Sequence, residues 1–231
     1  MKIHRFFSAD NLGEHVQHIT DERLVHQIRK VLRIRPGEQI RLFDGASECL
    51  YTMKGYGDDS IEVFFESHVP LLERGRKVTI ALSLIRKELF EFAVQKCVEI
   101  GVSSIVPLMC ARTERTNFDS TRMRKIMIEA TEQSGWGTVP ELSGPKDFDD
   151  FLSETSSSEA QKVLFHTEKG AKEVGASGSG AEIIAMIGPE GGFEDGEVEK
   201  ARAAGCEVAS LGKSVLRAET AAIVAAAKLT D

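Results

Sequence analysis

The chain has 231 residues, of which 42% are hydrophobic, and its 29 Lys and Arg against 36 Asp and Glu give a formal net charge of −7. A chain of this length can bury one large core or two smaller ones, and its acidic balance argues against a surface coated with basic charge for general nucleic-acid binding. No apolar run approaches the ~18 residues of a membrane span, and the start MKIHRFFSADN lacks the apolar stretch of a signal peptide, so we expect a soluble, cytoplasmic protein.

The first third of the chain has the pattern of a small all-β unit. Turn signals at Pro36-Gly37, Asp44-Gly45 and Gly57-Asp58 punctuate the β-rich runs HRFF (4–7), EQIRLFDG (38–45), ECLYTMKGYG (48–57) and SIEVFFESHV (60–69). One helix is predicted among them, over TDERLVHQIRKVLRI (20–34), with Thr20 or Asp21 as its cap. Its apolar face would consist of Leu24, Ile28, Val31 and Leu32.

Two clusters of basic residues stand out on this acidic chain. The stretch from Arg23 to Arg41 holds six basic residues against one acid, Glu38. The second cluster is diluted only by Glu114 and Asp119, and it consists of Arg112, Arg115, Arg122, Arg124 and Lys125. Such clusters are most often solvated faces, and an anionic ligand is the alternative hypothesis.

After the polar hinge PLLERGRK (70–77), strands and helices alternate. A buried strand, VTIALSLI (78–85), precedes a helix over 87–101 that would bury Leu89, Phe92, Ala93, Cys97 and Ile100 and stop at Gly101. The strand SSIVPLM (103–109) and a helix from about 119 to 134 follow, the helix with Met123, Ile126, Met127 and Ala130 inward. These alternating elements suggest a second domain that begins near residue 73.

Three more short apolar strands are predicted at KVLFH (162–166), EIIAMI (182–187) and EVASL (207–211). The polar, small-residue segments 153–161 and 170–182 are expected to be exposed loops. Strand and helix in turn predict a mostly parallel α/β sheet that is covered on both faces.

The cysteines and histidines show no metal-binding pattern. Cys49, Cys97, Cys110 and Cys206 are scattered, without a CxxC pair, and we expect them to be reduced and mostly buried. Five of the six histidines lie in the first third of the chain, again without ligand spacing. A structural zinc ion is therefore not expected.

In parallel α/β sheets, ligands bind at the carboxyl ends of the strands, so a binding site is expected in the loops that follow strands. After the strand 182–187 comes GPEGGFED, in which Gly188, Gly191 and Gly192 can take positive φ and allow close backbone approach, while Pro189 stiffens the turn. A dinucleotide fingerprint would need GxGxxG and an acidic end to the next strand, and neither is present. A purely structural strand-to-helix turn remains an alternative.

The second such loop is SLGKSVLRAETA (210–221), which leads into an alanine-rich helix near Glu219. Its Gly212-Lys213-Ser214 matches the end of a phosphate-binding P-loop. A P-loop also needs a glycine five residues before Gly212, where this chain has Glu207, whose carboxylate would repel phosphates. The loop is therefore not expected to bind phosphate.

Together, IGPEGGF (187–193) and LGKSVLRAETA (211–221) closely resemble the carboxyl-terminal signature of the RsmE family, the 16S ribosomal RNA uridine-N3 methyltransferases of the SPOUT class. Other segments agree in order and spacing, namely HQIRKVLRIRPGEQIRLFDG (26–45), QKCVEIGVSSIVPL (95–108), TERT (113–116) and KIMIEATEQSG (125–135). The resemblance implies a PUA-like β-barrel over residues 1–72 that helps to hold RNA. It also implies a SPOUT α/β domain with a trefoil knot over residues 73–231, which binds S-adenosylmethionine and forms a homodimer.

By the same resemblance, the two glycine-rich loops surround the cofactor. Ile187, Leu211, Val215 and Leu216 supply apolar packing for adenine, whereas Lys213 faces solvent. The implied cofactor-binding residues are Thr167, Ile187, Gly188, Pro189, Gly191, Gly192, Ser210, Leu211, Gly212, Val215, Leu216 and Ala218.

The implied reaction is methyl transfer to N3 of a uridine, which carries a proton and is a poor nucleophile until that proton leaves. A base or a cation that stabilises the uracil anion is required, and the candidates near the loops are Arg217, Glu190 and Glu219. For Glu219, a structural role in the first helical turn is an equal alternative. The implied RNA contacts are Arg29, Lys30, Arg33, Arg35, Arg112 and Arg115.

The chain departs from the family pattern after EQSG, where Trp136 replaces the usual arginine and could stack on a base or pack in the dimer. Other functions also remain open: a different RNA target, an RNA-binding module without catalysis, or a nucleotide-dependent α/β enzyme. Binding of S-adenosylmethionine would separate the first of these from the other two. The paired glycine loops argue against a pure binding module, which has no need of a cofactor pocket.

Overall fold

The computed structural model describes residues 3–10, 12–13, 15–114, 117–167, 172–173 and 182–230. The chain divides into two compact units, one of Met1–Glu73 with Thr131–Val139, and one of Arg74–Ala130 with Pro140–Asp231. The sequence suggested a boundary after residue 72 and assigned all later residues to the second domain. The assignment of 131–139 to the first unit is the main difference, and no composition change marks it.

The first unit contains a five-stranded sheet in the order β1-β3-β4-β5-β2. β1 pairs parallel with β3, and the other neighbours are antiparallel. The strands are β1 (His4–Phe7), β2 (Val16–Ile19), β3 (Gln39–Phe43), β4 (Glu48–Tyr56) and β5 (Ile61–Val69). The short β2 was not predicted, but the other four match the predicted runs.

The predicted helix of this unit is present in an altered form. It begins as α1 (Glu22–His26), whose cap Asp21 accepts hydrogen bonds from two backbone N–H groups, and continues as the π-helix η1 (Gln27–Leu32). Because a π-turn holds more residues than an α-turn, the expected face rotates along the helix. Leu24 and Ile28 are buried as predicted, but Val31 is 63% exposed.

Buried polar contacts attach residues 131–139 to the sheet of this unit. The Arg5 guanidinium donates to the carbonyl oxygens of Thr131 (3.0 Å) and Trp136 (2.7 Å). Glu132, which is almost fully buried, accepts a 3.0 Å hydrogen bond from Arg23. Arg23, at the start of the basic cluster, is therefore used in the fold.

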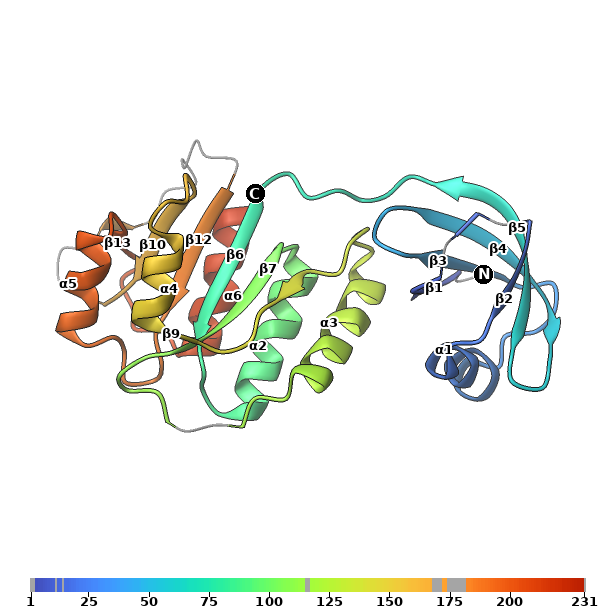
Figure 1. The fold of residues 1–231 in the computed structure, drawn as a ribbon, viewed down its shortest axis with the longest axis horizontal. Coiled ribbons are helices and arrows are strands. Elements are labelled where there is room, and N and C mark those ends of the chain that lie inside the picture. The colour runs from blue at the N-terminus through green and yellow to red at the C-terminus, as the bar shows by residue number, and fades with distance from the viewer. Residues whose placement is uncertain are drawn as a thin grey trace. The chain divides into compact units, whose positions relative to one another are not determined.

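The second unit is built on a parallel sheet (Figure 1) with the order β11-β13-β10-β12-β6-β7-β8, and β9 also pairs with β7. The strands are β6 (Lys77–Ser83), β7 (Ser104–Met109), β8 (Glu141–Leu142), β9 (Lys146–Asp147), β10 (Gln161–Phe165), β11 (Lys172–Glu173), β12 (Glu182–Ile187) and β13 (Glu207–Ser210). The parallel sheet predicted from the sequence is confirmed. The segment 170–182 lies mostly outside the described residues.

Helices cover both faces of this sheet, as Figure 1 shows with α4 in front and α6 behind. On one face, α4 (Phe148–Thr155) and α5 (Asp195–Ala203) share a core with alternate strand residues such as Ile184 and Met186. On the other face, α6 (Ala218–Thr230) packs on β6, β12 and α2 (Lys87–Ile100). The remaining helix is α3 (Ser120–Ser134).

The buried face of α2 differs from the prediction by about one residue. Ala93 and Cys97 are buried as expected, but Phe92 is 46% exposed, and the other buried residues are Phe90, Val94 and Val98. Two neighbouring stripes of this helix are apolar, so the periodicity identified the helix without fixing which stripe faces the core. Gly101 ends the helix with φ of 114°, as predicted.

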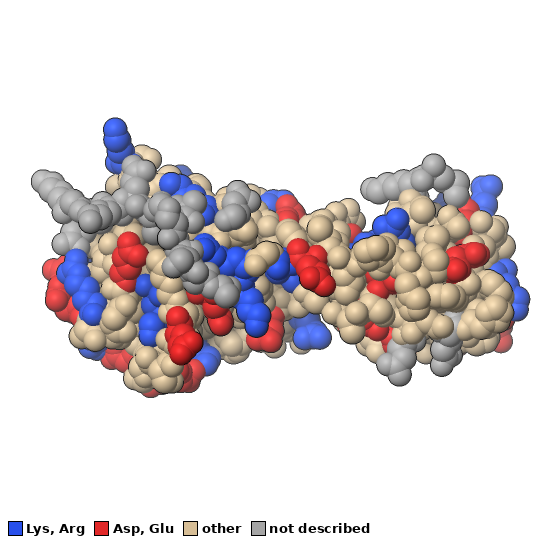
Figure 2. Space-filling model, turned by 90° about the horizontal axis from the view of Figure 1, so that it is seen from above, with Lys and Arg blue, Asp and Glu red and all other residues tan. Residues whose placement is uncertain are grey.

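Acidic and basic side chains stand beside one another over much of the face drawn in Figure 2.

The four cysteines are buried, which confirms the expectation from the sequence. In the described ranges, no three His, Cys, Asp or Glu side chains gather closely enough to hold a metal ion. No helix in the same ranges is both long and apolar enough to cross a membrane.

Candidate functional site

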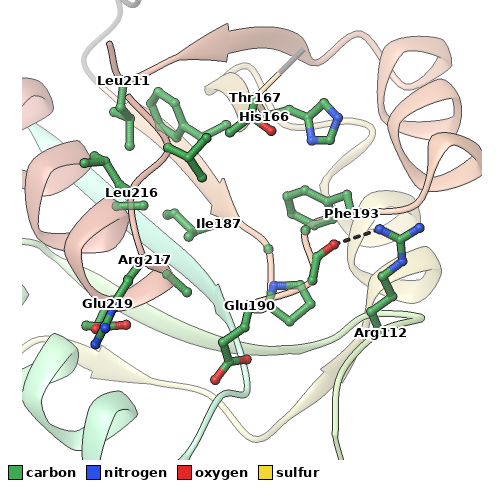
Figure 3. A pocket seen from close by; sticks show the side chains of 18 of the residues that line it. Arg112, His166, Thr167, Ile187, Glu190, Phe193, Leu211, Leu216, Arg217 and Glu219 are labelled. Atoms are coloured by element: carbon green, nitrogen blue, oxygen red, sulfur yellow. Dashed lines mark hydrogen bonds between the residues drawn. The ribbon is translucent and has the colours of Figure 1, made fainter. Parts of the chain in front are cut away.

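A pocket of about 960 Å³ lies in the second unit (Figure 3), where the loops that follow five of the parallel strands meet. This volume is typical of a site for a cofactor-sized ligand. The loops after β6, β7, β10, β12 and β13 all contribute, and the lining includes Arg86, Leu89, Arg112, Glu114, Phe165, His166, Thr167, Ile187, the segment 188–193, Ser210, Leu211 and the segment 214–219. The carboxyl edge of the sheet is thus where the pocket forms, as the ligand rule for parallel sheets predicts.

The glycines of the loop after β12 serve different purposes. A Cβ atom on Gly188 would lie 3.1 Å from the backbone N of Phe193, and one on Gly191 would lie 3.2 Å from Cδ of Arg112. Gly192 has φ of +69°, but a Cβ there would meet no atom within 4 Å. The sequence attributed both positive φ and close approach to all three. Close approach therefore holds for Gly188 and Gly191, and positive φ for Gly192 alone.

Arg112 holds this loop in place. Its guanidinium donates a 2.7 Å hydrogen bond to the carbonyl oxygen of Gly191 (dashed in Figure 3), and its Nε lies 3.7 Å from a carboxylate oxygen of Glu194. The buried Glu197 adds a second link, because its two oxygens accept hydrogen bonds from the backbone N–H groups of Ala111 and Glu194, each 2.8 Å long. The loops after β7 and β12 are thus joined through backbone and side-chain contacts.

The loop after β13 has an apolar and an exposed part. Ile187 is buried and Leu211 and Leu216 are half-buried around the pocket, whereas Val215 is 79% exposed on its rim. The Ser210 hydroxyl donates to the carbonyl oxygen of Gly212 (2.8 Å) and accepts from its N–H (3.1 Å). This local turn keeps the strand end compact. Val215 lines the pocket although it is exposed, and its packing against the cofactor stays a prediction.

Three ionisable side chains predicted for catalysis line the pocket. Arg217 and Glu190 are exposed, whereas Glu219 is only 7% exposed. Oε2 of Glu219 is shielded from solvent and accepts no hydrogen bond. Figure 3 places Arg217 and Glu219 on the same side of the pocket, far from Arg112.

Every residue predicted to bind the cofactor lines the pocket except Gly212. Lys213 is exposed, as predicted. Arg115 lies outside the described residues. The roles of the lining residues stay predictions, because position in a pocket does not identify a ligand.

The basic residues predicted to bind RNA in the first unit are not part of this pocket. Lys30, Arg33 and Arg35 are exposed on or after η1. Arg29 is half-buried, with its guanidinium carbon 5.1 Å from the centre of the Tyr56 ring and hydrogen bonds to two backbone carbonyl oxygens. Arg29 therefore has a structural role whether or not it also meets RNA.

Several pocket residues were not predicted. Arg86 and Leu89 follow β6, His166 follows β10, and Phe193 closes the glycine loop. The rule that ligands meet the carboxyl ends of strands, applied to every strand, would have found Arg86 and His166. Leu89 could not have been found in that way, because it was expected to be buried in the hydrophobic core beneath its helix.

Comparison with known families gives two matches along the chain. Residues 73–230 match the model of an RNA methyltransferase domain, and residues 19–66 match that of an RNA methyltransferase PUA domain.

Individual relatives agree over most of their length. The chain is 28% identical to the ribosomal RNA small subunit methyltransferase E of Rickettsia conorii, an alignment that covers 99% of this chain and 96% of the relative. It is 30% identical to the enzyme of the same name from Synechocystis, over 89% of this chain and 70% of the relative. The crystal structure of ribosomal RNA small subunit methyltransferase E from Neisseria gonorrhoeae, bound to S-adenosyl methionine, superposes with a TM-score of 0.89 at 29% identity, covering 98% and 96% of the two chains.

Proposed function

Because the chain belongs to the RNA methyltransferase family that includes the ribosomal RNA small subunit methyltransferases E, we propose that it transfers a methyl group from S-adenosylmethionine to N3 of one uridine in 16S ribosomal RNA. The observation that carries this proposal is the pocket at the carboxyl edge of the parallel sheet, in a fold that superposes on a relative bound to S-adenosyl methionine.

The residues of the pocket suit this cofactor. Ile187, Leu211 and Leu216 provide an apolar wall for adenine, while the glycine loop exposes backbone groups for polar edges. Glu219, in the wall of the pocket, has a buried oxygen, Oε2, without a hydrogen-bond donor among the described residues, so this oxygen can accept a hydrogen bond from a ligand. We infer that the loops around this pocket are the ones threaded into the trefoil knot.

When bound, S-adenosylmethionine supplies a methyl group on a positively charged sulfur, ready for in-line transfer. The protein has to align the uracil ring and to stabilise the loss of the N3 proton. Arg217 is exposed at the pocket and stays cationic, so its planar donors can offset negative charge on the uracil oxygens. Glu190, exposed on the glycine loop, can accept the N3 proton and release it to water.

The first unit is proposed to hold the RNA. Lys30, Arg33 and Arg35 are exposed and close in sequence, which suits contacts to phosphates. We also propose that the active form is a homodimer, as the family resemblance implies. A ribosomal RNA substrate would place the reaction in the cytoplasm.

The proposal is tested by incubating the purified protein and labelled S-adenosylmethionine with small ribosomal subunits, with protein-free 16S ribosomal RNA, and with transfer RNA. Label in 16S ribosomal RNA, recovered as N3-methyluridine, is the expected result. Label in transfer RNA alone would favour a different RNA target. RNA binding without transfer to any of these, and without affinity for S-adenosylmethionine, would favour a non-catalytic binding module.

A further inference from the structure

Two buried glutamates of the second unit differ in how their carboxylates are satisfied. Glu197 is 8% exposed, and each of its oxygens accepts a 2.8 Å hydrogen bond from a backbone N–H. Glu219 is 7% exposed, yet its Oε2 has no donor. Buried carboxylates are normally paired or hydrogen-bonded, because water no longer solvates their charge. Both oxygens of Glu197 have a donor within the protein, whereas Oε2 of Glu219 has none.

Within the described part of the chain, Glu219 forms no ion pair, although Arg217 is two residues away in the sequence and lies on the same side of the pocket (Figure 3). The start of α6 provides some compensation, because the helix dipole favours an anion in its first turn. An ionised Glu219 would therefore gain most from a cation that enters the pocket.

We propose that Glu219 binds the ammonium group at the amino-acid end of the cofactor, an inference that rests on the proposed function. An ammonium group offers a positive charge and three donors, which match a carboxylate whose oxygen lacks a partner. The N–H of uracil offers one donor and no charge, so it would leave the buried charge uncompensated.

The shape of the pocket agrees with this assignment. Figure 3 shows Leu211, Leu216 and Ile187 along one wall, and Arg217 and Glu219 beyond Leu216 at its end. If adenine packs against the apolar wall, the amino-acid end of the cofactor would lie toward a polar part of the pocket. Glu219 is a buried carboxylate in that part, whereas Glu114 and Glu190 are exposed and remain solvated.

The test compares two ligands that differ only at the amino-acid end, which includes the ammonium group that Glu219 would recognise. S-adenosylhomocysteine carries the ammonium group, and 5′-methylthioadenosine lacks the whole amino-acid end. Their affinities are measured by calorimetry, with displacement titration for the weaker ligand, on the wild-type protein and on Glu219→Gln. The matched control is Glu88→Gln, the same chemical change at an exposed glutamate that also lies in the first turn of a helix, α2, and does not line the pocket.

Glu219→Gln is expected to lower the affinity for S-adenosylhomocysteine by roughly tenfold or more, the usual effect of removing a charged hydrogen bond. The affinity for 5′-methylthioadenosine should not change. Glu88→Gln should change neither affinity. Equal weakening of both ligands in Glu219→Gln would overturn the inference and assign Glu219 to the shape of the pocket. Unchanged affinity for both would overturn it as well, and a reduced transfer rate in that variant would then indicate a role with the uridine.

Failure of the proposed function gives a different result. In that case the wild-type protein would bind neither ligand. Because substitution of a buried carboxylate can disturb the start of α6, the variants are also compared by thermal unfolding. Glu219→Asp, which keeps the charge on a shorter side chain, should retain part of the preference for S-adenosylhomocysteine.

Discussion

The Arg112 guanidinium donates a 2.7 Å hydrogen bond to the carbonyl oxygen of Gly191, and so joins the loop after β7 to the glycine loop after β12. The sequence suggested Arg112 as an RNA contact, but this bond gives it a role in shaping the pocket. Arg112→Ala is expected to lower affinity for S-adenosylmethionine by about tenfold, the effect of one charged hydrogen bond of about 1.5 kcal/mol.

Calorimetry measures this effect, and Arg122→Ala is the control. Arg122 also carries a paired guanidinium, but its partner Glu91 lies on α2 and neither residue lines the pocket. If Arg112→Ala binds the cofactor normally and instead reduces the salt dependence of RNA binding, the original assignment as an RNA contact holds.

The second prediction concerns the close approach at Gly188. A Cβ atom there would lie 3.1 Å from the ring and the backbone N of Phe193, so Gly188→Ala should destabilise the fold by about 1–3 kcal/mol through overpacking and weaken cofactor binding. Gly196→Ala, at an exposed position in α5 with open space around it, should instead stabilise by about 0.5–1 kcal/mol. Urea unfolding measures the change in the free energy of unfolding for each variant. If the two variants are equally stable, the close approach at Gly188 does not matter for the fold.

The sequence predicted the elements of the sheet well and the details of the site less well. The strands β6, β7, β10, β12 and β13 were apparent from short apolar runs, because parallel strands covered on both faces contain few polar residues. The π-turn at Gln27 and the buried stripe of α2 were missed, because apolar periodicity does not resolve a shift of one residue.

Within the site, the sequence identified both loops but not what each residue does. Val215 is exposed, and Arg112 donates a hydrogen bond to the carbonyl oxygen of Gly191. Both features depend on how loops that are distant in the sequence meet, which no local pattern encodes. The unpaired oxygen of Glu219 likewise appears only when all neighbouring donors are known.

A third prediction addresses the reaction. Arg217 is exposed at the pocket, where its charge can offset the uracil anion that forms only during transfer. Arg217→Ala should therefore reduce kcat by about 10²-fold, while the affinities for S-adenosylmethionine and for RNA change little. Single-turnover methyl transfer with saturating RNA separates the two effects. A defect confined to RNA affinity would make Arg217 a positioning residue, and normal kinetics would move the assignment to Glu190.

The fourth prediction concerns the basic residues of the first unit. Lys30 and Arg33 are exposed, so replacing both with alanine should weaken RNA binding and reduce the slope of log K against log salt by about 0.7 for each single-strand phosphate that is no longer neutralised. Cofactor affinity should not change. Arg29→Ala should differ, because Arg29 donates to the carbonyl oxygens of Gly57 and Asp58, and its removal should lower the unfolding temperature. A salt slope that stays the same in the double variant would mark these residues as a solvated face.

The proposed reaction places a methyl group on N3 of one uridine in 16S ribosomal RNA. The most direct measurement is mass spectrometry of 16S ribosomal RNA fragments from cells that lack the protein, from cells that regain it, and from cells that carry the Arg217→Ala variant. We predict that N3-methyluridine disappears from a single position without the protein, returns with the wild-type chain, and stays strongly reduced with the variant. N3-methyluridine that persists at full level without the protein, or a methyl group that disappears from another base or another RNA, would rule out this reaction.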